Sequence, residues 1–290
     1  MSRAEVGDIA LELFEPDETG EPARTVPVVL LHGIGGSADT FAGVGPLLAA
    51  AGWRTVAWDA PGYGASADPG PEVAGPLTGP DSPGAYVELV AGLLERLDAP
   101  HAHLVGVSWG GVICTQVAVR RPEVVASLTL IDSTRGSATT PEKAAAMRGR
   151  VAELQAVGAE QFAAGRAPRL LADGADLTVA REVARQMSSV RLAGYAGAAE
   201  MMAQSDTGPV LSSITAPTLV LVGDQDLVTG VEESRLLADA IRQAQFGLVR
   251  NAGHAAVQEQ PVEVADALLR FLAGLPEEAP SDRTRQESIR

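Results

Sequence analysis

Cysteine, histidine and aromatic residues are scarce in this sequence of 290 residues, and its positive charges are outnumbered. Cys114 is the single cysteine, which excludes a disulfide within the chain and is typical of a reducing cytoplasm. The 22 basic residues face 37 acidic ones, giving a net charge of −15, and form no cluster longer than a pair. This argues against nucleic acid or an anionic membrane as a partner.

Long hydrophobic runs are also missing. No run approaches the ~20 apolar residues of a membrane-spanning helix, and the N-terminal stretch has no apolar core of signal-peptide length. We therefore expect a soluble, cytoplasmic protein. Hydrophobic residues still make up 46% of the chain, enough for one domain with a large core and an inserted subdomain.

The hydrophobic pattern alternates between strand-like and helix-like segments. Short, β-branched apolar runs, typical of strands, occur at 9–14, 25–32, 54–59, 103–108, 125–132, 217–224 and 245–250. Helical spacing follows at 42–51, 84–97, 109–121, 230–243 and 261–273. Near-continuous apolar strands are buried on both faces, which predicts a mostly parallel, doubly wound α/β sheet covered by helices.

The strand pattern stops between residues 134 and 208, where apolar residues recur at helical spacing. We expect this stretch to be an inserted helical lid, with residues 1–133 and 209–274 forming the α/β core. The polar segment 275–290 is expected to be a disordered tail.

The glycine-rich stretch "VVLLHGIGGSA" (28–38) has two interpretations. Its pattern G-x-G-x-x-A matches a loop that binds a dinucleotide pyrophosphate, with Asp59 as the ribose ligand. Alternatively, the loop leaves a backbone N–H free to bind the oxyanion of an acyl-transfer reaction. Asp59 lies 26 residues beyond Gly33, further than the ~20 that the dinucleotide motif requires.

The strongest motif is "VGVSWGG", in which Gly106-Val107-Ser108-Trp109-Gly110 matches G-x-S-x-G between a strand and a helix. In that context the motif forms a nucleophile elbow. Glycines at 106 and 110 relieve the steric crowding of the turn, which exposes Ser108 above the edge of the sheet. The beginning of the following helix favours negative charge at the same point.

A serine nucleophile needs a general base, and the chain offers only four histidines. His32 precedes the glycine-rich turn, whereas His101 and His103 lie before the strand that leads to Ser108. His254, in "RNAGHAAVQEQP", follows the last strand at the same sheet edge as Ser108, and is therefore the expected base.

The base requires an orienting carboxylate, and three aspartates qualify. Asp224 and Asp226 follow a buried strand in "LVGDQDLVTG", and Asp132 ends another. All three give the chain order Ser…Asp…His. Asp226 is favoured, because it lies far enough beyond its strand to reach His254.

The expected nucleophile, base and carboxylate, which together form a catalytic triad, decide between the two interpretations of the glycine-rich loop. A dinucleotide site would leave Ser108, Asp226 and His254 as coincidences. We therefore expect the backbone N–H groups of Ile34 and Trp109 to form an oxyanion hole.

These motifs resemble those of the α/β-hydrolase superfamily along nearly the whole chain. "HGIGGSADTF", "WDAPGYGAS", "GVSWGG", "PTLVLVGDQDLVT" and "NAGHAAVQEQP" stand in that family's order. "GYAGAAEMMAQSD" and "AGHAAVQEQP" are similar to the 3-oxoadipate enol-lactonase group. The resemblance implies an eight-stranded sheet, a helical lid and a serine hydrolase of small esters or lactones that needs no cofactor or metal.

The substrate pocket is less clearly marked in the sequence. We expect His32, Gly33 and Trp109 to border it, although Trp109 is equally suited to core packing. We expect the methionines of residues 134–208 mainly to pack the helices of the lid against one another. A lid arginine is a candidate for binding a substrate carboxylate; the candidates are Arg148, Arg166, Arg169, Arg185 and Arg191, of which we single out Arg191.

Other functions fit the same motifs. One is a carbon–carbon bond hydrolase of vinylogous diketones, although such enzymes often carry Trp after the catalytic His, where this chain has Ala255. Others are a hydrolase-fold ligand receptor and a cyclase or transferase built on the same elbow.

Overall fold

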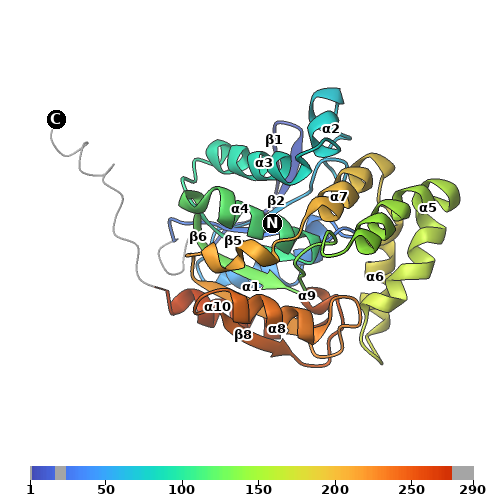
Figure 1. Ribbon diagram of the computed structural model, residues 1–290. Coiled ribbons are helices and arrows are strands. Elements are labelled where there is room, and N and C mark those ends of the chain that lie inside the picture. The colour runs from blue at the N-terminus through green and yellow to red at the C-terminus, as the bar shows by residue number, and fades with distance from the viewer. Residues whose placement is uncertain (1, 17–23, 276–290) are drawn as a thin grey trace.

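An eight-stranded sheet forms the centre of the protein, as the computed structural model shows for residues 2–16 and 24–275 (Figure 1). The strand order is β1-β2-β4-β3-β5-β6-β7-β8; β2 runs antiparallel to both of its neighbours, β1 and β4, and the remaining neighbouring pairs are parallel. The strands are β1 (Ser2–Val6), β2 (Ile9–Phe14), β3 (Val28–Leu31), β4 (Thr55–Trp58), β5 (Ala102–Val107), β6 (Val125–Ile131), β7 (Thr218–Gly223) and β8 (Gln245–Val249). This confirms the mostly parallel α/β fold.

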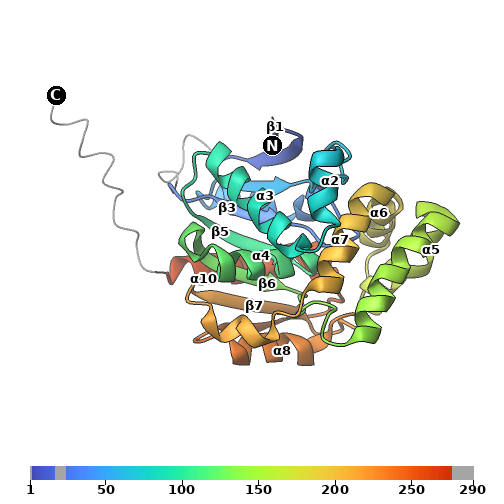
Figure 2. The same ribbon diagram turned by 45° about the horizontal axis from the view of Figure 1, so that its top comes forward.

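Helices cover both faces of the sheet, because β3 to β7 are apolar on both sides (Figure 2). One core lies beneath α3, α4 and α8, and the other beneath α1 and α10. The helices are α1 (Val44–Ala50), α2 (Pro71–Leu77), α3 (Ser82–Arg96), α4 (Trp109–Arg120), α5 (Pro141–Arg166), α6 (Leu177–Ser188), α7 (Leu192–Gln204), α8 (Gly230–Ala240), α9 (Ala256–Glu259) and α10 (Pro261–Ala273).

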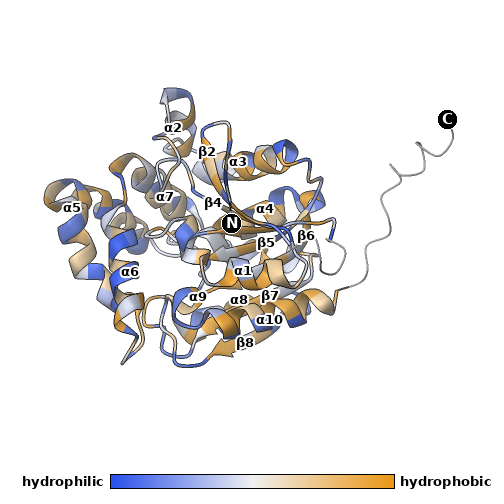
Figure 3. Ribbon diagram, turned by 180° about the vertical axis from the view of Figure 1, so that it is seen from behind, coloured by the Kyte–Doolittle hydropathy of each residue, from blue (hydrophilic) through white to orange (hydrophobic). Residues whose placement is uncertain are grey.

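The segment between β6 and β7 contains α5, α6 and α7 and lies to one side of the sheet (Figure 1). Figure 3 shows α5 and α6 as mixtures of hydrophilic and hydrophobic residues, whereas the strands and α10 are mainly hydrophobic. The helix α5 is broken at Gly158, whose φ of 76° is not helical. A short 3₁₀ helix, η3 (Ala167–Leu170), follows α5 directly and precedes α6 in the chain.

Three of these elements were not expected from the sequence, namely β1, α2 and the single-turn helix α9. The strand β1 is short, charged and largely exposed, and α2 contains Gly75 and Pro76. Apart from residue 275, the tail expected at 275–290 lies outside the described residues. Along the described chain, no helix is both long and apolar enough to span a membrane.

Candidate active site

Ser108 occupies the sharp turn between β5 and α4. Its φ of 51° and ψ of −113° form a strained conformation that non-glycine residues rarely adopt. A Cβ on Gly106 would lie 2.4 Å from the backbone of Gly110, and a Cβ on Gly110 would lie 2.1 Å from the carbonyl oxygen of Leu31. Both glycines are therefore required by close backbone packing, and the turn presents the Ser108 side chain at the carboxyl edge of the sheet.

Three side chains that lie far apart in the sequence form one hydrogen-bonded chain at that edge. Ser108 Oγ lies 3.0 Å from His254 Nε2, and His254 Nδ1 lies 3.0 Å from Asp226 Oδ2. Asp226 is held in turn by the Thr229 hydroxyl at 2.5 Å and the Val228 N–H at 2.7 Å. Because a carboxylate only accepts, His254 carries its proton on Nδ1 and leaves Nε2 free to accept from Ser108.

The two alternative aspartates have other partners. Asp132 accepts hydrogen bonds from the N–H groups of Gly223 at 2.8 Å and Ala256 at 3.3 Å, and Asp224 accepts from Ala252 at 3.4 Å. Asp132 therefore connects the end of β6 with β7 and the loop after His254. Of the three aspartates, the structure brings Asp226 into hydrogen-bonding contact with the histidine.

The pKa values of these groups follow from their surroundings. Burial lowers the pKa of His254, but the hydrogen bond and charge of Asp226 outweigh it and raise that pKa above its usual 6.5. Burial raises the pKa of Asp226, but contacts with His254 and Thr229 outweigh it and bring the value to about 2. Burial raises the pKa of Asp132 to about 8. Asp226 is thus the carboxylate that stays ionised beside the imidazole.

The glycine-rich loop is fixed by the ring of His32. The ring is fully buried; its Nδ1 donates to the Gly33 carbonyl at 2.8 Å, and its Nε2 accepts from the Ala60 N–H at 3.1 Å. The Gly33 carbonyl also accepts from Gly36 N–H at 2.9 Å. Since the carbonyl and N–H of a trans peptide point in opposite directions, these bonds orient the N–H of Ile34.

The N–H groups of Ile34 and Trp109 have no acceptor within the described part of the chain. Both residues line the same cavity as Ser108. By contrast, the Asp59 carboxylate accepts from the N–H groups of Ala38 at 2.7 Å and Ala65 at 2.8 Å, so it supports the loop from within. Asp59 is buried, and each of its carboxylate oxygens already holds a backbone N–H, which indicates a structural role and not that of a ribose ligand.

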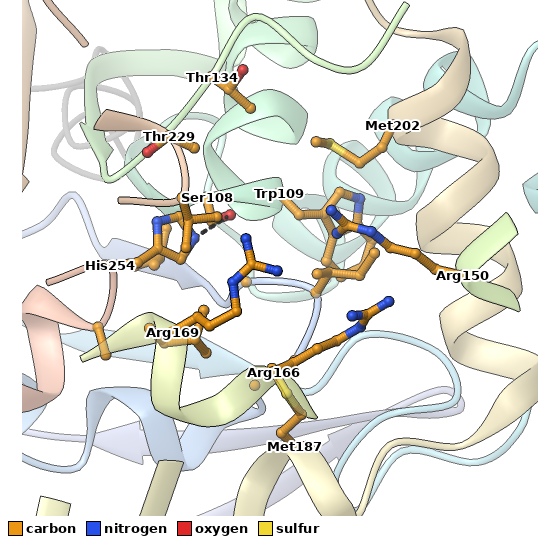
Figure 4. Close-up of a pocket in the computed structure, with 18 of the residues that line it drawn as sticks. Ser108, Trp109, Thr134, Arg150, Arg166, Arg169, Met187, Met202, Thr229 and His254 are labelled. Atoms are coloured by element: carbon orange, nitrogen blue, oxygen red, sulfur yellow. Dashed lines mark hydrogen bonds between the residues drawn. The ribbon is translucent and has the colours of Figure 1, made fainter. Parts of the chain in front are cut away.

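The cavity in front of Ser108 has a volume of about 410 Å³ and extends toward α5, α6 and α7 (Figure 4). Of the expected pocket residues, Gly33 and Trp109 line it. Trp109 also packs in the core, with ring centroids 5.6 Å from Tyr63 and 5.2 Å from Tyr86. His32 is not among the described lining residues, and its part is to hold the loop behind the cavity wall.

Arg191 is placed away from the cavity, contrary to expectation. Its guanidinium donates to Asp68 and to the carbonyls of Gly64 and Ser66, so it joins the start of α7 to the loop after β4. Arg148 and Arg185 are also engaged at the surface, with Glu200 and with Asp39 and Glu182 respectively. Arg166 and Arg169 do line the cavity.

Arg150 and Lys143 were missed by the sequence analysis, yet both line the cavity. Arg150 follows the buried Met147 by three positions and therefore shares its helix face, which is the signal that could have identified it. Among the described residues, no group of three or more His, Cys, Asp or Glu side chains is arranged to hold a metal ion.

Residues 26–261 match the alpha/beta hydrolase fold family. RutD from Variovorax paradoxus (strain S110), provisionally named a carbamate hydrolase, is 29% identical over 88% of this chain and 95% of its own. The 3-oxoadipate enol-lactonase 1 from Acinetobacter baylyi is 26% identical over 65% of this chain and 70% of its own. A thermophilic esterase from Thermogutta terrifontis, solved with malate bound, superposes with a TM-score of 0.80 at 26% identity, covering 92% of this chain and 94% of that one.

The match to the family spans most of the chain, and the relatives named above are hydrolytic enzymes or are named as such. The fold, the strand order and the eight-stranded sheet agree with that match. The chain therefore belongs to the α/β-hydrolase family and is a hydrolase of the esterase, lactonase and carbamate-hydrolase kind.

Proposed function

We propose that this chain is a serine hydrolase that cleaves a small carboxylic ester or lactone through an acyl-enzyme intermediate. The observation that carries this proposal is the hydrogen-bonded chain from Ser108 through His254 to Asp226, with Ser108 at the wall of the cavity. A hydroxyl is a weak nucleophile, and an adjacent neutral imidazole is the group that activates it.

In the first step, His254 Nε2 takes the proton of Ser108 as the oxygen attacks the carbonyl carbon. The imidazolium that forms is stabilised by Asp226, which also keeps the proton of the neutral ring on Nδ1. The same Nε2 proton is then given to the leaving oxygen, which breaks the ester bond. The acyl group remains on Ser108.

The negative charge of the tetrahedral intermediate is assigned to the free N–H groups of Ile34 and Trp109. Removing one such donor typically costs an enzyme ~3 kcal/mol of transition-state stabilisation. Trp109 is the first residue of α4, so its N–H also lies at the positive end of the helix dipole. In the second half-reaction, His254 activates a water that releases the acid from Ser108.

We also propose that residues 134–208 act as a lid on a core formed by 1–133 and 209–274. The N–H of Ala255 donates to the carbonyl of Leu170 at 2.9 Å, and Glu259 accepts from the N–H groups of Ala172 at 2.8 Å and Gly253 at 2.7 Å. These bonds join the inserted segment to the loop that holds His254. A lid in this position would shield the acyl-enzyme from bulk water.

Hydrolysis of p-nitrophenyl esters from acetate to octanoate, with a γ-lactone and an enol-lactone, tests the proposal. Wild-type protein should turn over at least one of them, and Ser108→Ala should lower kcat by a factor on the order of 10³ or more. Ser213→Ala is the matched control, because Ser213 is exposed on the short helix before β7 and does not line the cavity.

Each alternative outcome has a definite meaning. Turnover that survives in Ser108→Ala would disprove the acyl-enzyme mechanism. A folded wild-type protein that cleaves none of the esters or lactones would contradict the esterase and lactonase assignment. Cleavage of a vinylogous diketone in that case would indicate a carbon–carbon bond hydrolase, and ligand binding without turnover would indicate a receptor.

A further inference from the structure

The cavity in front of Ser108 is rich in positive charge, although the chain as a whole carries a net charge of −15. Four cationic side chains line it, namely Lys143, Arg150, Arg166 and Arg169. Among the described residues, Glu233 is the one acidic side chain of the lining. Positive charge is therefore concentrated where a substrate would bind, against the general charge of the surface.

Two of the charged lining residues are already neutralised by partners. Glu233 is bound by Arg135 through two hydrogen bonds of 2.9 and 3.0 Å, and Arg166 donates to Glu153 at 2.5 Å. The guanidinium of Arg166 also lies 4.2 Å from the centre of the Phe162 ring. These contacts fix both side chains, so the unbalanced charge of the cavity comes from the remaining cations.

Arg150 and Arg169 have no carboxylate partner within 4.0 Å among the described residues. Figure 4 shows both guanidinium groups directed into the space between α5 and the Ser108–His254 pair. An arginine in such a position pairs readily with a planar carboxylate, because its N–H groups match the two oxygens.

Both arginines lie near the reacting atoms, since each lines the cavity that Ser108 and His254 also line. The charge of Arg150 acts on His254, whose pKa it lowers, and on Tyr195, whose pKa it also lowers and which lines the same cavity. Arg169 lies in η3, whose next residue, Leu170, accepts the 2.9 Å hydrogen bond from the N–H of Ala255. The short helix that carries Arg169 is thus bonded to the loop that holds His254, and Arg150 lines the same cavity from α5.

We propose that Arg150 and Arg169 bind an ionised carboxylate of the substrate, so that the natural substrate class is an ester or lactone that carries a second, free acid group. This inference rests on the proposed serine-hydrolase function. The acid group occupies the side of the cavity next to α5 and η3, while the scissile carbonyl lies at Ser108. Arg166 lines the same cavity, but it is already paired with Glu153 and packed on Phe162, so it is not assigned to the carboxylate.

Matched esters that differ in one charge test the proposal. Mono-p-nitrophenyl esters of straight-chain diacids carry the acid on the acyl side, and their methyl esters are the neutral counterparts. Acetyl esters of 4-hydroxybenzoate and of methyl 4-hydroxybenzoate place the same difference on the leaving group. The wild-type protein should prefer the acid form in at least one pair, by about tenfold or more in kcat/KM, as expected for charge-assisted hydrogen bonds.

The variants Arg150→Gln and Arg169→Gln should each lower this acid-to-neutral ratio by about tenfold. Arg148→Gln is the matched control, because Arg148 is on the same helix, two residues from Arg150, and pairs with Glu200 at the surface. It removes the same charge from the molecule without touching the cavity, so the ratio should not change. Arg150→Lys should recover part of the ratio, since it restores charge without the planar fork.

Calorimetric titration with the free diacids and with their neutral diamides provides a readout that does not depend on turnover. Binding of the diacid that is lost in Arg150→Gln and Arg169→Gln, but kept in Arg148→Gln, supports the carboxylate site even if no ester is cleaved. In that case the proposed hydrolase function alone would fail. Equal kcat/KM for acid and neutral esters in every pair, with no diacid binding, would overturn the carboxylate site and leave the hydrolase proposal intact.

Discussion

At the scale of single residues, His254 sets how the proposed reaction responds to pH. The ring must be neutral to accept the Ser108 proton, and its pKa is raised above 6.5 by Asp226 in spite of burial. We therefore expect kcat/KM to rise with pH and to reach half of its plateau above pH 6.5. Asp226 stays ionised throughout, because its pKa is about 2. Rates with p-nitrophenyl acetate, corrected for spontaneous hydrolysis, provide the profile.

The variant Asp226→Asn separates the two effects of the carboxylate. It removes the charge that raises the His254 pKa, so the half-maximal pH should move downward. It also favours the tautomer of His254 that carries its proton on Nε2 and cannot accept the Ser108 proton. At the plateau, kcat should therefore fall by a factor on the order of 10⁴, as the comparable change does in serine proteases. An unchanged profile would show that Asp226 does not set the pKa of the base.

His32 is expected to act as a positioning residue for the glycine-rich loop that carries the Ile34 N–H. Its Nδ1–H fixes the Gly33 carbonyl and with it the direction of the Ile34 N–H. His32→Leu removes that bond and should lower kcat by about tenfold or more with little change in KM, since the lost stabilisation belongs to the transition state. His32→Asn, which offers an amide N–H in nearly the same place, should recover part of kcat. Equal loss in both variants would favour a purely structural role.

The sequence was sufficient for the strongly patterned part of the site. Ser108 and its glycines form a local motif, and His254 was the histidine left at the correct sheet edge, so the geometry of both could be anticipated. Arg150 and Arg191 could not be sorted in the same way. Which arginine reaches the cavity depends on how α5 and α7 pack, and in particular on where α5 breaks at Gly158. Residue spacing along α5 places Arg150 on the same face as the buried Met147, but it does not show which of the lid arginines reach the cavity once the helices pack.

At the scale of elements, α7 approaches the loop after β4 through two glycines. A Cβ on Gly194 would lie 2.5 Å from the carbonyl oxygen of Gly62. Alanine normally stabilises a helix relative to glycine by about 1 kcal/mol. Here the clash should outweigh that gain, so Gly194→Ala should lower the free energy of unfolding by roughly 1–3 kcal/mol.

Gly149→Ala is the matched control for this prediction. Gly149 lies in α5, and a Cβ there would meet no atom within 4 Å. The same substitution should therefore raise the free energy of unfolding by up to about 1 kcal/mol. Urea denaturation of both variants measures the two signs directly. If Gly194→Ala were as stable as Gly149→Ala, the contact between α7 and the loop would not hold in solution.

The elements themselves were predictable where one physical signal dominated. Strands such as β3 and β7 are buried on both faces and have continuous apolar runs. The strand β1 pairs with β2 through its backbone, while its side chains remain largely exposed, so no hydrophobic pattern marks it. Helix α2 buries Leu77 alone and contains a proline, so neither spacing nor propensity indicates it.

At the scale of the whole molecule, the net charge of −15 governs association between copies. The isoelectric point is about 4.7, so repulsion between molecules vanishes as the pH approaches that value. We expect light scattering to increase as the pH is lowered toward 4.7 and activity to return when the pH is raised again. A solution that remains clear through pH 4.7 would contradict this expectation.

The association expected near pH 4.7 should not involve unfolding of the active site. The folded-state pKa of Asp226 is depressed from 3.8 to about 2, so the stability it contributes is present above pH 3.8 and is lost only as the pH falls through about 2. Asp132 acts in the opposite direction, because its pKa of about 8 means that protonation favours the folded state as the pH falls from 8 toward 3.8. Tryptophan fluorescence recorded beside the scattering should therefore keep its native spectrum at pH 4.7. A shift toward the unfolded spectrum before the scattering rises would mean that acid opens the fold first, and that loss of charge is not what brings the molecules together.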